Sequence, residues 1–366
     1  MTQARIRAVF MRGGTSRAVF FHERDLPPAG AARDRILSAA LGSPDPYGRQ
    51  LDGMGGGISS LSKACIIGPP TLAGADVDYT FAQVDVKSTL VDYAGNCGNC
   101  SGAVGPFAID EKLVAAVEGE TVVRIHNTNT KKLIVAHVPV EDGEAAVTGD
   151  FELPGVPGKG ARIALDFVDP GGAVTGKLLP TGSPRDVIDG IEVSCVDATN
   201  PVVFVRARDV GIAGTETPVA IDADRALGAR LERIRVAAAE RMAIAPGPGQ
   251  PKIAMVAPAQ AFTALDGTRY EADQVDLVAR AISMGNCHRA FMLTGAMCLA
   301  VAARIEGTLV HEASGAPKTD VRLGHPSGVV PIDAAVVARD GAPWAERVTV
   351  YRTARRLMEG FVRIPC

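Results

Sequence analysis

An internal repeat is the feature that most constrains the fold. Residues 7–26 and 191–210 align without a gap at an offset of 184 residues, and six aligned positions carry identical residues. The identical residues of the first copy are Val9, Thr15, Val19, Phe20, Arg24 and Asp25. Each copy predicts a strand, a polar turn, a second apolar strand and an acidic stop.

The same order of features continues beyond this unit. Lys63 and Lys252 each precede an apolar strand, and the pairs Asn96-Cys97 and Asn286-Cys287 each precede a helical stretch of small residues. We therefore expect two similar halves, roughly 1–185 and 186–366, related by a pseudo-two-fold axis. The alternative is a chance similarity between two α/β domains.

The glycine and proline content favours strands. Forty glycines and 24 prolines imply many tight turns and few long helices. Residues 31–41 predict a polar helix, and 288–303 predict one that is apolar nearly all round and therefore buried. Strands expected at 64–67, 121–125, 133–138 and 348–351 suggest a sheet wrapped about a central helix. The C-terminal residues predict a final strand that returns to either half.

The charge and cysteine content exclude several classes of protein. A net charge of −3 does not favour nucleic acid or an anionic membrane as partner. The sequence contains no apolar run of the roughly 20 residues that a membrane helix needs, and its N-terminus lacks the apolar block of a signal peptide. Seven cysteines, an odd number, favour free thiols in a reducing cytoplasm. We expect a cytoplasmic protein that acts on a small molecule.

The sharpest local motif is the glycine-rich turn at residues 95–102, GNCGNCSG. Its glycines allow a close approach to a ligand. A thiol at the start of the following helix should have a lowered pKa, so Cys97 is a candidate proton donor or acceptor. Two alternatives stay open for Cys97-X-X-Cys100: half of a zinc site, although the sequence has no second C-x-x-C, and a redox pair, although the surroundings are not thioredoxin-like.

Two further glycine turns carry candidate residues. In residues 11–17, MRGGTSR, the hydroxyls of Thr15 and Ser16 and the guanidinium of Arg12 suit a carboxylate, although an ordinary hairpin would have the same pattern. In residues 53–63, glycines and hydroxyls precede Lys63. Burial lowers the pKa of an amine and makes it a usable general base. A solvated lysine at a strand edge is the alternative.

Two helix N-termini are expected to face the cleft between the halves. Their free N–H groups and dipoles favour negative charge, so the pair suits a substrate with carboxylates at both ends. At the second of them, His288 is a candidate substrate contact, and a purely structural histidine is equally compatible with the sequence.

The blocks MRGGTSRAVFF, SSLSKACIIG, GNCGNCSGAVGPFAI, TGKLLPTG, VSCVDATNPVVFV, SMGNCHRAFMLTGA, GHPSG and RTARRLMEG resemble the signature blocks of the PrpF family, in the same order and over nearly the whole chain. This resemblance implies a diaminopimelate epimerase-like α/β (α+β) fold. Such a fold has two pseudo-symmetric domains, each a curled, mostly antiparallel sheet around a central helix, with the active site in the cleft between them.

The resemblance also implies site residues. The catalytic lysine of the family falls on Lys63 and its cysteine on Cys97, with the carboxylate contacts of the glycine turn on Thr15 and Ser16. The full set of expected substrate-binding residues is Arg12, Thr15, Ser16, Ser62, Asn96, Gly98, Asn99, Met284, Gly285, His288 and Ser327. No metal and no cofactor are expected, and a homodimer is one possible assembly.

The implied activity is a cofactor-independent 1,3-allylic proton shift in a small unsaturated di- or tricarboxylate. The preferred substrate is 4-oxalomesaconate, from protocatechuate or gallate breakdown. The main alternative is 2-methylaconitate, from propionate catabolism, followed by aconitate or methylitaconate. Two other functions stay open: a racemase or epimerase that uses Cys97 and Cys287, and a non-enzymatic binding protein for polycarboxylates.

Overall fold

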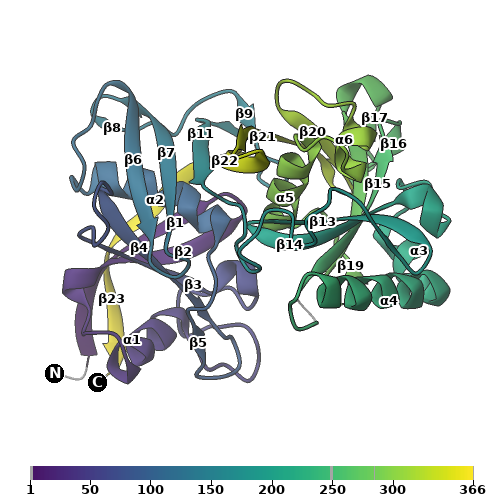
Figure 1. Ribbon diagram of the computed structural model, residues 1–366. Coiled ribbons are helices and arrows are strands. Elements are labelled where there is room, and N and C mark those ends of the chain that lie inside the picture. Colours follow the sequence, from purple (N-terminus) through teal and green to yellow (C-terminus); the bar gives the residue numbers. More distant parts are fainter. Residues whose placement is uncertain (1–2, 248–249, 284, 366) are drawn as a thin grey trace. The chain divides into compact units, whose positions relative to one another are not determined.

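The computed structural model describes residues 3–247, 250–283 and 285–365, and the chain forms two compact units (Figure 1). Unit 1 comprises the chain up to Phe167 together with the segment that begins at Tyr351, and unit 2 comprises Val168–Val350. The repeat suggested the ranges 1–185 and 186–366, whereas the first boundary between the units falls after Phe167, and the last segment of the chain belongs to unit 1.

The sheet of unit 1 mixes parallel and antiparallel pairs. Along it, the pairs β1–β2, β3–β4, β6–β7 and β7–β11 are antiparallel, whereas β2–β3 and β4–β6 are parallel. These strands are β1 (Gln3–Gly13), β2 (Ser16–His22), β3 (Lys63–Gly68), β4 (Val77–Val84), β6 (Gly119–Asn127), β7 (Lys132–Glu141) and β11 (Ile163–Val168). The short strands are β5 (Val91–Asp92), β8 (Glu144–Ala145), β9 (Phe151–Glu152) and β10 (Lys159–Gly160).

The C-terminal strand completes the sheet of unit 1. Strand β23 (Ala354–Pro365), yellow in Figure 1, pairs antiparallel with the purple β1, from Gln3 opposite Pro365 to Gly13 opposite Ala354. This long pairing joins the two ends of the chain. It shows that the final strand belongs to unit 1, which the sequence had left open.

A buried helix fills the curled sheet of unit 1. In α2 (Gly98–Asp110), every residue from Cys100 to Ile109 is buried, as expected for a helix that is apolar on all sides. A Cβ added to Gly105 would lie 2.7 Å from a methyl group of Val138 on β7, so this glycine lets the helix approach the sheet closely. The predicted polar helix is also present, as α1 (Ala31–Leu41).

Unit 2 repeats the connectivity of unit 1. The pairs β13–β14, β15–β18 and β20–β21 are antiparallel, and β14–β15 and β18–β20 are parallel, in the same order along the chain. These strands are β13 (Ile191–Ala198), β14 (Asn200–Arg206), β15 (Lys252–Pro258), β18 (Leu277–Ser283), β20 (Val321–His325) and β21 (Gly328–Arg339). The predicted repeat of α/β halves is therefore confirmed at the level of strand order and direction.

The register of the paired strands extends this likeness to single residues. Val19 lies opposite Ala64 in unit 1, and Val203 lies opposite Ile253 in unit 2. Lys63 comes directly before Ala64, and Lys252 comes directly before Ile253. The two lysines therefore occupy equivalent positions in their own sheets.

The buried helix of unit 2 is α5 (Leu293–Ala303), in which every residue from Gly295 to Ala303 is buried. The prediction that this helix begins near His288 was wrong. Cys287 donates its backbone N–H to the carboxylate of Asp222, and the His288 N–H donates to the Ala281 carbonyl. These bonds hold the preceding residues extended as β19 (Asn286–Cys287), and the helix starts only after Met292.

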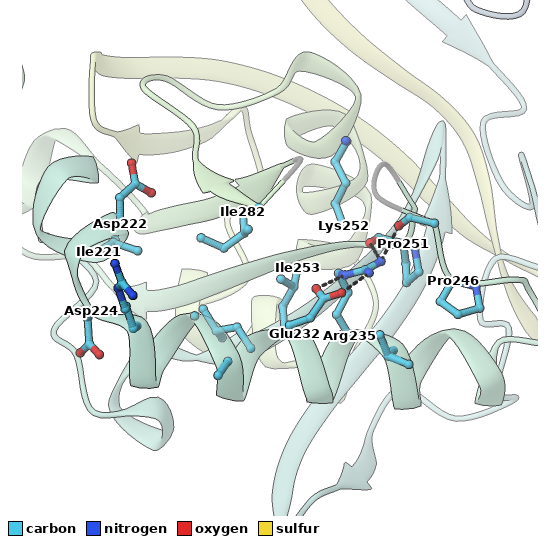
Figure 2. Close-up of a pocket in the computed structure, with 17 residues that line it drawn as sticks. Ile221, Asp222, Asp224, Glu232, Arg235, Pro246, Pro251, Lys252, Ile253 and Ile282 are labelled. Carbon is cyan, nitrogen blue, oxygen red and sulfur yellow. Dashed lines mark hydrogen bonds and ion pairs between the residues drawn. The ribbon is translucent and has the colours of Figure 1, made fainter.

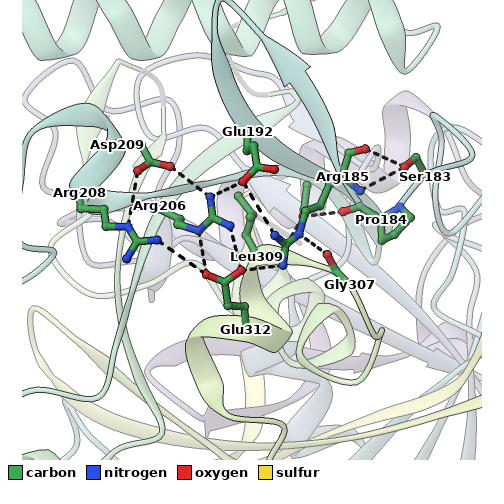
Figure 3. A network of polar contacts seen from close by, with 11 residues as sticks. Ser183, Pro184, Arg185, Glu192, Arg206, Arg208, Asp209, Gly307, Leu309 and Glu312 are labelled. Atoms are coloured by element: carbon green, nitrogen blue, oxygen red, sulfur yellow. Dashed lines mark hydrogen bonds and ion pairs between the residues drawn. The ribbon is translucent and has the colours of Figure 1, made fainter.

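A network of ion pairs ties α6 (Leu309–Ser314) to the sheet of unit 2 (Figure 3). Arg206 donates to both carboxylate oxygens of Glu312 and to Glu192, and Arg185 also donates to Glu312. The Arg206 guanidinium lowers the pKa of Glu312 to about 2. The network joins residues from two strands, one loop and one helix.

The remaining strands and helices complete the two units. The strands are β12 (Asp186–Ile188), β16 (Phe262–Thr263), β17 (Arg269–Tyr270) and β22 (Ala342–Arg352). The helices are α3 (Pro218–Ala223) and α4 (Arg225–Arg241), with 3-10 turns at Glu23–Asp25, Ser59–Leu61, Ala207–Val210 and Ala272–Gln274. Among the described residues, no helix combines the length and the apolar character that crossing a membrane requires.

Candidate active site

The glycine turn between β1 and β2 packs directly against the first turn of α2. A Cβ added to Gly13 would lie 2.5 Å from the carbonyl oxygen of Asn99. Gly14 has a φ of +51°, and a Cβ there would lie 2.4 Å from Asn99 Oδ1. Only glycine allows this approach, so the MRGGTS motif serves to bring its hydroxyls to the start of α2.

Thr15 and Asn99 meet at this junction. Asn99 Nδ2 donates to Thr15 Oγ1 at 3.1 Å, and Asn99 Oδ1 accepts from Arg352 Nε at 3.0 Å. Thr15 is exposed, so its hydroxyl is accessible to a ligand, whereas Ser16 is buried at the start of β2. The structure thus joins two of the predicted substrate-binding residues by a hydrogen bond.

Arg12 supports the turn from within. Its Nη1 donates to the carbonyl oxygens of Gly14 and Thr353, both at 2.9 Å. Burial and then the charge of Arg355 lower the pKa of Arg12. The donors of this guanidinium hold the shape of the turn, and a direct contact of Arg12 with substrate stays a prediction.

Cys97 is the N-cap residue of α2 and is partly exposed. Its pKa is raised well above the usual value of a thiol, first by the hydrogen bond with Cys100 and then by burial, while the charge of Lys63 acts in the opposite direction. The predicted lowering of this pKa was wrong, because the hydrogen bond with Cys100 and the burial of the thiol both raise it. Cys97 is therefore a protonated thiol at neutral pH.

Lys63 is the first residue of β3 and is buried, with 7% of its surface exposed. Its amine donates to Gln83 Oε1 at 2.6 Å and lies 4.9 Å from the centre of the Phe81 ring. Within the described part of the chain, this amine forms no ion pair with a carboxylate. Lys63 also acts electrostatically on Cys97, so the two predicted catalytic side chains share one region of unit 1.

Gln83 orients this amine, and the sequence analysis missed it. Gln83 lies directly opposite Lys63 in the β3–β4 register. Its Nε2 donates to the carbonyl oxygens of Ser59 and Ser62, which leaves Oε1 to face the amine. A polar residue near the end of the apolar strand 77–84 was the available signal, but the sequence does not reveal which strand lies opposite Lys63.

Other predicted residues of unit 1 have supporting positions. Ser62 is fully buried, and its hydroxyl accepts from Gln50 and donates to the Val84 carbonyl, so it anchors the start of β3. The Asn96 carboxamide accepts from Ser101 and Asn127, which fixes the turn before α2. Gly98 is the first residue of the helix.

The predicted residues of unit 2 lie near β19. His288 Nδ1 accepts from the N–H of Ala290, and burial lowers its pKa. Ser327 Oγ donates to the carbonyl of Arg289 at 2.6 Å. Gly285 is exposed with a φ of +80°, and Met284 lies outside the described residues.

A pocket of about 720 Å³ lies within unit 2, between α3, α4 and β15 (Figure 2). Its wall includes Lys252, the counterpart of Lys63, and Arg235. The Arg235 guanidinium donates to Glu232 and to three backbone carbonyls, and in Figure 2 the Lys252 amine points away from α4. The residues that line this pocket include neither Lys63 nor Cys97.

The described residues contain no group of three or more histidine, cysteine, aspartate or glutamate side chains placed to hold a metal ion. Within the part of the chain that the structure describes, Cys97 and Cys100 therefore belong to no such group for the zinc site that the sequence left open.

Three known proteins resemble this chain in sequence over nearly its whole length. The chain is 46% identical to a 3-methylitaconate isomerase of Eubacterium barkeri, with 99% of this chain and 98% of the relative covered. It is 43% identical to a 2-methyl-aconitate isomerase of Shewanella oneidensis, with 99% and 98% covered, and 40% identical to a 4-oxalomesaconate tautomerase of Pseudomonas putida, with 100% and 97% covered.

Solved structures agree with these relatives. A crystal structure of a methylitaconate-delta-isomerase matches all of this chain and 97% of its own, with a TM-score of 0.93 and 44% identity. A hydroxyproline epimerase from Agrobacterium vitis shares the fold at 13% identity, with a TM-score of 0.50 over 99% and 92% of the two chains. Residues 3–365 match the family described as "PrpF protein". The chain therefore belongs to the PrpF family.

Proposed function

We propose that this protein is a cofactor-independent isomerase that moves a proton along three carbons of a small unsaturated di- or tricarboxylate. The observation that carries the proposal is the buried Lys63 amine, which is held by Gln83 and lies near the protonated Cys97 thiol. Family membership supports it, because the relatives named above are isomerases or a tautomerase of methylitaconate, methylaconitate and oxalomesaconate.

The proposed reaction begins at an allylic C–H bond. A carboxylate or keto group conjugated to the double bond acidifies this bond, and the Lys63 amine removes the proton. Negative charge then moves onto an oxygen of the conjugated group. We propose that backbone N–H groups at the start of α2 and the Thr15 hydroxyl receive this oxygen, because the N-terminus of a helix has N–H groups without partners inside the helix. One well-placed donor of this kind contributes roughly 3–4 kcal/mol.

Lys63 and Cys97 have different roles in the transfer of the proton. The raised pKa of Cys97 keeps its thiol protonated at neutral pH, which suits a donor and not a base. We propose that Lys63 takes the proton from one carbon and that either the resulting ammonium or the Cys97 thiol gives a proton to the other. If Cys97 is the donor, the ammonium of Lys63 then returns its proton to the thiolate, which restores both groups.

The individual substrate is a finer proposal. We propose 4-oxalomesaconate first, with 2-methylaconitate and methylitaconate as the alternatives. The names of the three relatives cover all of these acids, so their similarity supports the shared chemistry: two or three carboxylates around one double bond.

An assay in deuterated water tests the function directly. The protein is incubated with each of these acids and with aconitate, and proton NMR follows the product and the position of deuterium. We expect one acid to isomerise, and Lys63→Met to lose at least a thousandfold in kcat while its circular dichroism is unchanged. Near-native turnover by Lys63→Met would refute the base role, and saturable binding without product from any acid would indicate a binding protein.

The two-thiol racemase is the second candidate, and the structure argues against it. Cys287 is 2% exposed and lies in the extended strand β19, and burial, followed by the charge of Asp222, raises its pKa to about 11. The isomerase predicts that Cys287→Ala keeps its activity. A complete loss in that variant, with deuterium exchange at a stereocentre of the wild-type substrate, would favour the racemase.

A further inference from the structure

We propose that Arg352 is a positioning residue of the candidate active site, which fixes the Asn99 side chain against Thr15 and places a positive charge beside the first turn of α2. Arg352 ends β22, 253 residues away from Asn99 in the sequence, and reaches the site because the C-terminal segment belongs to unit 1.

The contacts of Arg352 define the orientation of Asn99. Arg352 Nε donates to Asn99 Oδ1, so the Nδ2 group of Asn99 must point the other way, where it donates to Thr15 Oγ1. The hydroxyl of Thr15 thereby receives a hydrogen bond, and its own proton is free to be donated to a bound oxygen. Without Arg352, the carboxamide of Asn99 could turn over and reverse its donor and acceptor.

Packing fixes the Arg352 side chain in this place. Arg352 is 6% exposed. A Cβ added to Gly102 on α2 would lie 3.0 Å from Arg352 Cβ, and a Cβ added to Gly14 would lie 2.9 Å from Arg352 Cδ. The arginine is therefore enclosed between the glycine turn and the helix, and a glycine on each side makes room for it.

The charge of Arg352 is not neutralised by a carboxylate among the described residues. Its guanidinium donates to Asn99 and to the Tyr351 carbonyl. Burial lowers its pKa to about 10, and Cys97 is the group that acts against this shift. A buried, unneutralised cation beside a helix N-terminus favours negative charge at that point.

The other titratable groups that interact electrostatically with Cys97 or with its neighbours come from three elements. They are Lys63 and Cys65 on β3, Tyr79 on β4 and Cys100 on α2. Burial raises the pKa of Tyr79, and a hydrogen bond with Cys65 together with burial raises that of Cys100, so neither of these two groups carries a negative charge near pH 7. Arg352 therefore contributes positive charge beside Cys97 that no negatively charged neighbour in this set offsets.

The catalytic consequence rests on the proposed function. Negative charge develops on a substrate oxygen during the allylic shift, and Arg352 favours it through the orientation of Asn99 and Thr15 and through its own charge. Arg352→Gln should therefore lower kcat at least tenfold and change KM less, whereas Arg352→Lys should recover part of kcat by restoring the charge.

The test uses Arg352→Gln, Arg352→Lys and Asn99→Ala, with Arg363→Gln as the control. Arg363 is exposed on β23 of the same unit, so its substitution removes one positive charge away from the site. The readouts are kcat and KM, and the pH dependence of Cys97 alkylation by iodoacetamide, followed by peptide mass spectrometry. Cys97 is partly exposed, whereas Cys65, Cys100, Cys195, Cys287 and Cys298 are buried, so its alkylation can be followed separately.

Expected results separate the role of Arg352 from a general loss of structure. In Arg352→Gln the alkylation midpoint of Cys97 should move to higher pH by half a unit or more, with a smaller shift in Arg352→Lys and none in Arg363→Gln. Asn99→Ala should lower kcat but leave the midpoint nearly unchanged. A folded Arg352→Gln with a wild-type midpoint and with kcat within twofold would overturn the proposal.

The alkylation readout does not require a substrate. If the wild-type protein isomerises none of the acids, the proposed function fails, and the shift of the Cys97 midpoint in Arg352→Gln still decides whether Arg352 acts on this site. If the acids are isomerised but the midpoint and kcat do not respond, only the inference about Arg352 fails.

Discussion

Replacing Gln83 with leucine tests whether the amine at position 63 must be held in place. The Lys63 amine donates to Gln83 Oε1 at 2.6 Å, and the Phe81 ring is its other close contact that the structure describes. Leucine has a similar size but no acceptor, so the amine would lose its only described hydrogen bond and could turn toward other positions.

The size of the effect follows from this bond. A hydrogen bond to a charged group contributes about 1.5–3 kcal/mol, and about 1.4 kcal/mol corresponds to a factor of ten. We therefore expect kcat/KM of Gln83→Leu to fall about 10- to 100-fold. The two bonds from Nε2 to the carbonyls of Ser59 and Ser62 are also lost, which should lower the free energy of unfolding by about 1–3 kcal/mol.

A glutamate at the same position separates geometry from charge. Gln83→Glu keeps an acceptor beside Lys63 but adds a negative charge that favours the protonated amine. The acid limb of the kcat/KM profile should move to higher pH by about 1–3 units, because more hydroxide is then needed to free the base. Gln83→Leu removes the acceptor without adding a charge, so it should lower kcat/KM and should not move the acid limb to higher pH.

The assay follows the isomerisation by NMR between pH 5 and 10, with kcat/KM expressed per folded protein from circular dichroism. Gln260→Leu is the matched control, since Gln260 also donates through Nε2 to a carbonyl, that of Ala213, but belongs to unit 2, whereas Lys63 belongs to unit 1. A folded Gln83→Leu with kcat/KM within twofold of the wild type would show that this hydrogen bond does not matter for the reaction.

Three further perturbations test the fold that supports the site. Phe107→Ala should lower the free energy of unfolding by about 3–5 kcal/mol in urea, because Phe107 is fully buried on α2; a loss below 1 kcal/mol would contradict its role in the core. Gly14→Ala should cost more stability than Gly74→Ala in thermal melts and should also lower kcat. Both glycines have positive φ, but only at Gly14 would the added Cβ meet an atom, at 2.4 Å; equal costs would refute the packing argument. Glu312→Gln should destabilise the protein by about 1 kcal/mol at neutral pH, a modest value because the carboxylate is partly exposed. The pKa of Glu312 is lowered to about 2 by Arg206, so its contribution is present above its usual pKa near 4.5 and is lost as the pH falls toward 2; the variant should lack this part of the acid transition.

The repeat allowed much of the fold to be predicted. The two strand–turn–strand units, the lysine-bearing strands and the helix after Cys97 occur where their hydrophobic patterns place them, because these patterns depend on residues close in the sequence. The start of the second buried helix was misplaced. The apolar pattern extends back toward His288, but the bond from the Cys287 N–H to Asp222, a residue 65 positions earlier, keeps that segment extended.

In the candidate site, too, some features could be predicted from the sequence and others could not. Cys97 was predicted at a helix start and is the N-cap of α2, since glycines on both sides set the local backbone. The direction of its pKa shift was not predictable in the same way. It depends on a hydrogen bond with Cys100 and on burial under the sheet, which the helix dipole alone does not describe.

The sequence by itself determined the family, the repeated order of strands and helices, and the identity of the lysine and the thiol, because all of these are carried by short motifs and local periodicity. Only the tertiary structure decided which distant residues contact the lysine and the turn that carries the thiol. Gln83 faces Lys63 across a strand pair 20 residues apart, and Arg352 meets Asn99 across 253 residues. The physical reason is that hydrogen bonds and desolvation depend on distance in space, and the folding of the chain into a curled sheet sets that distance.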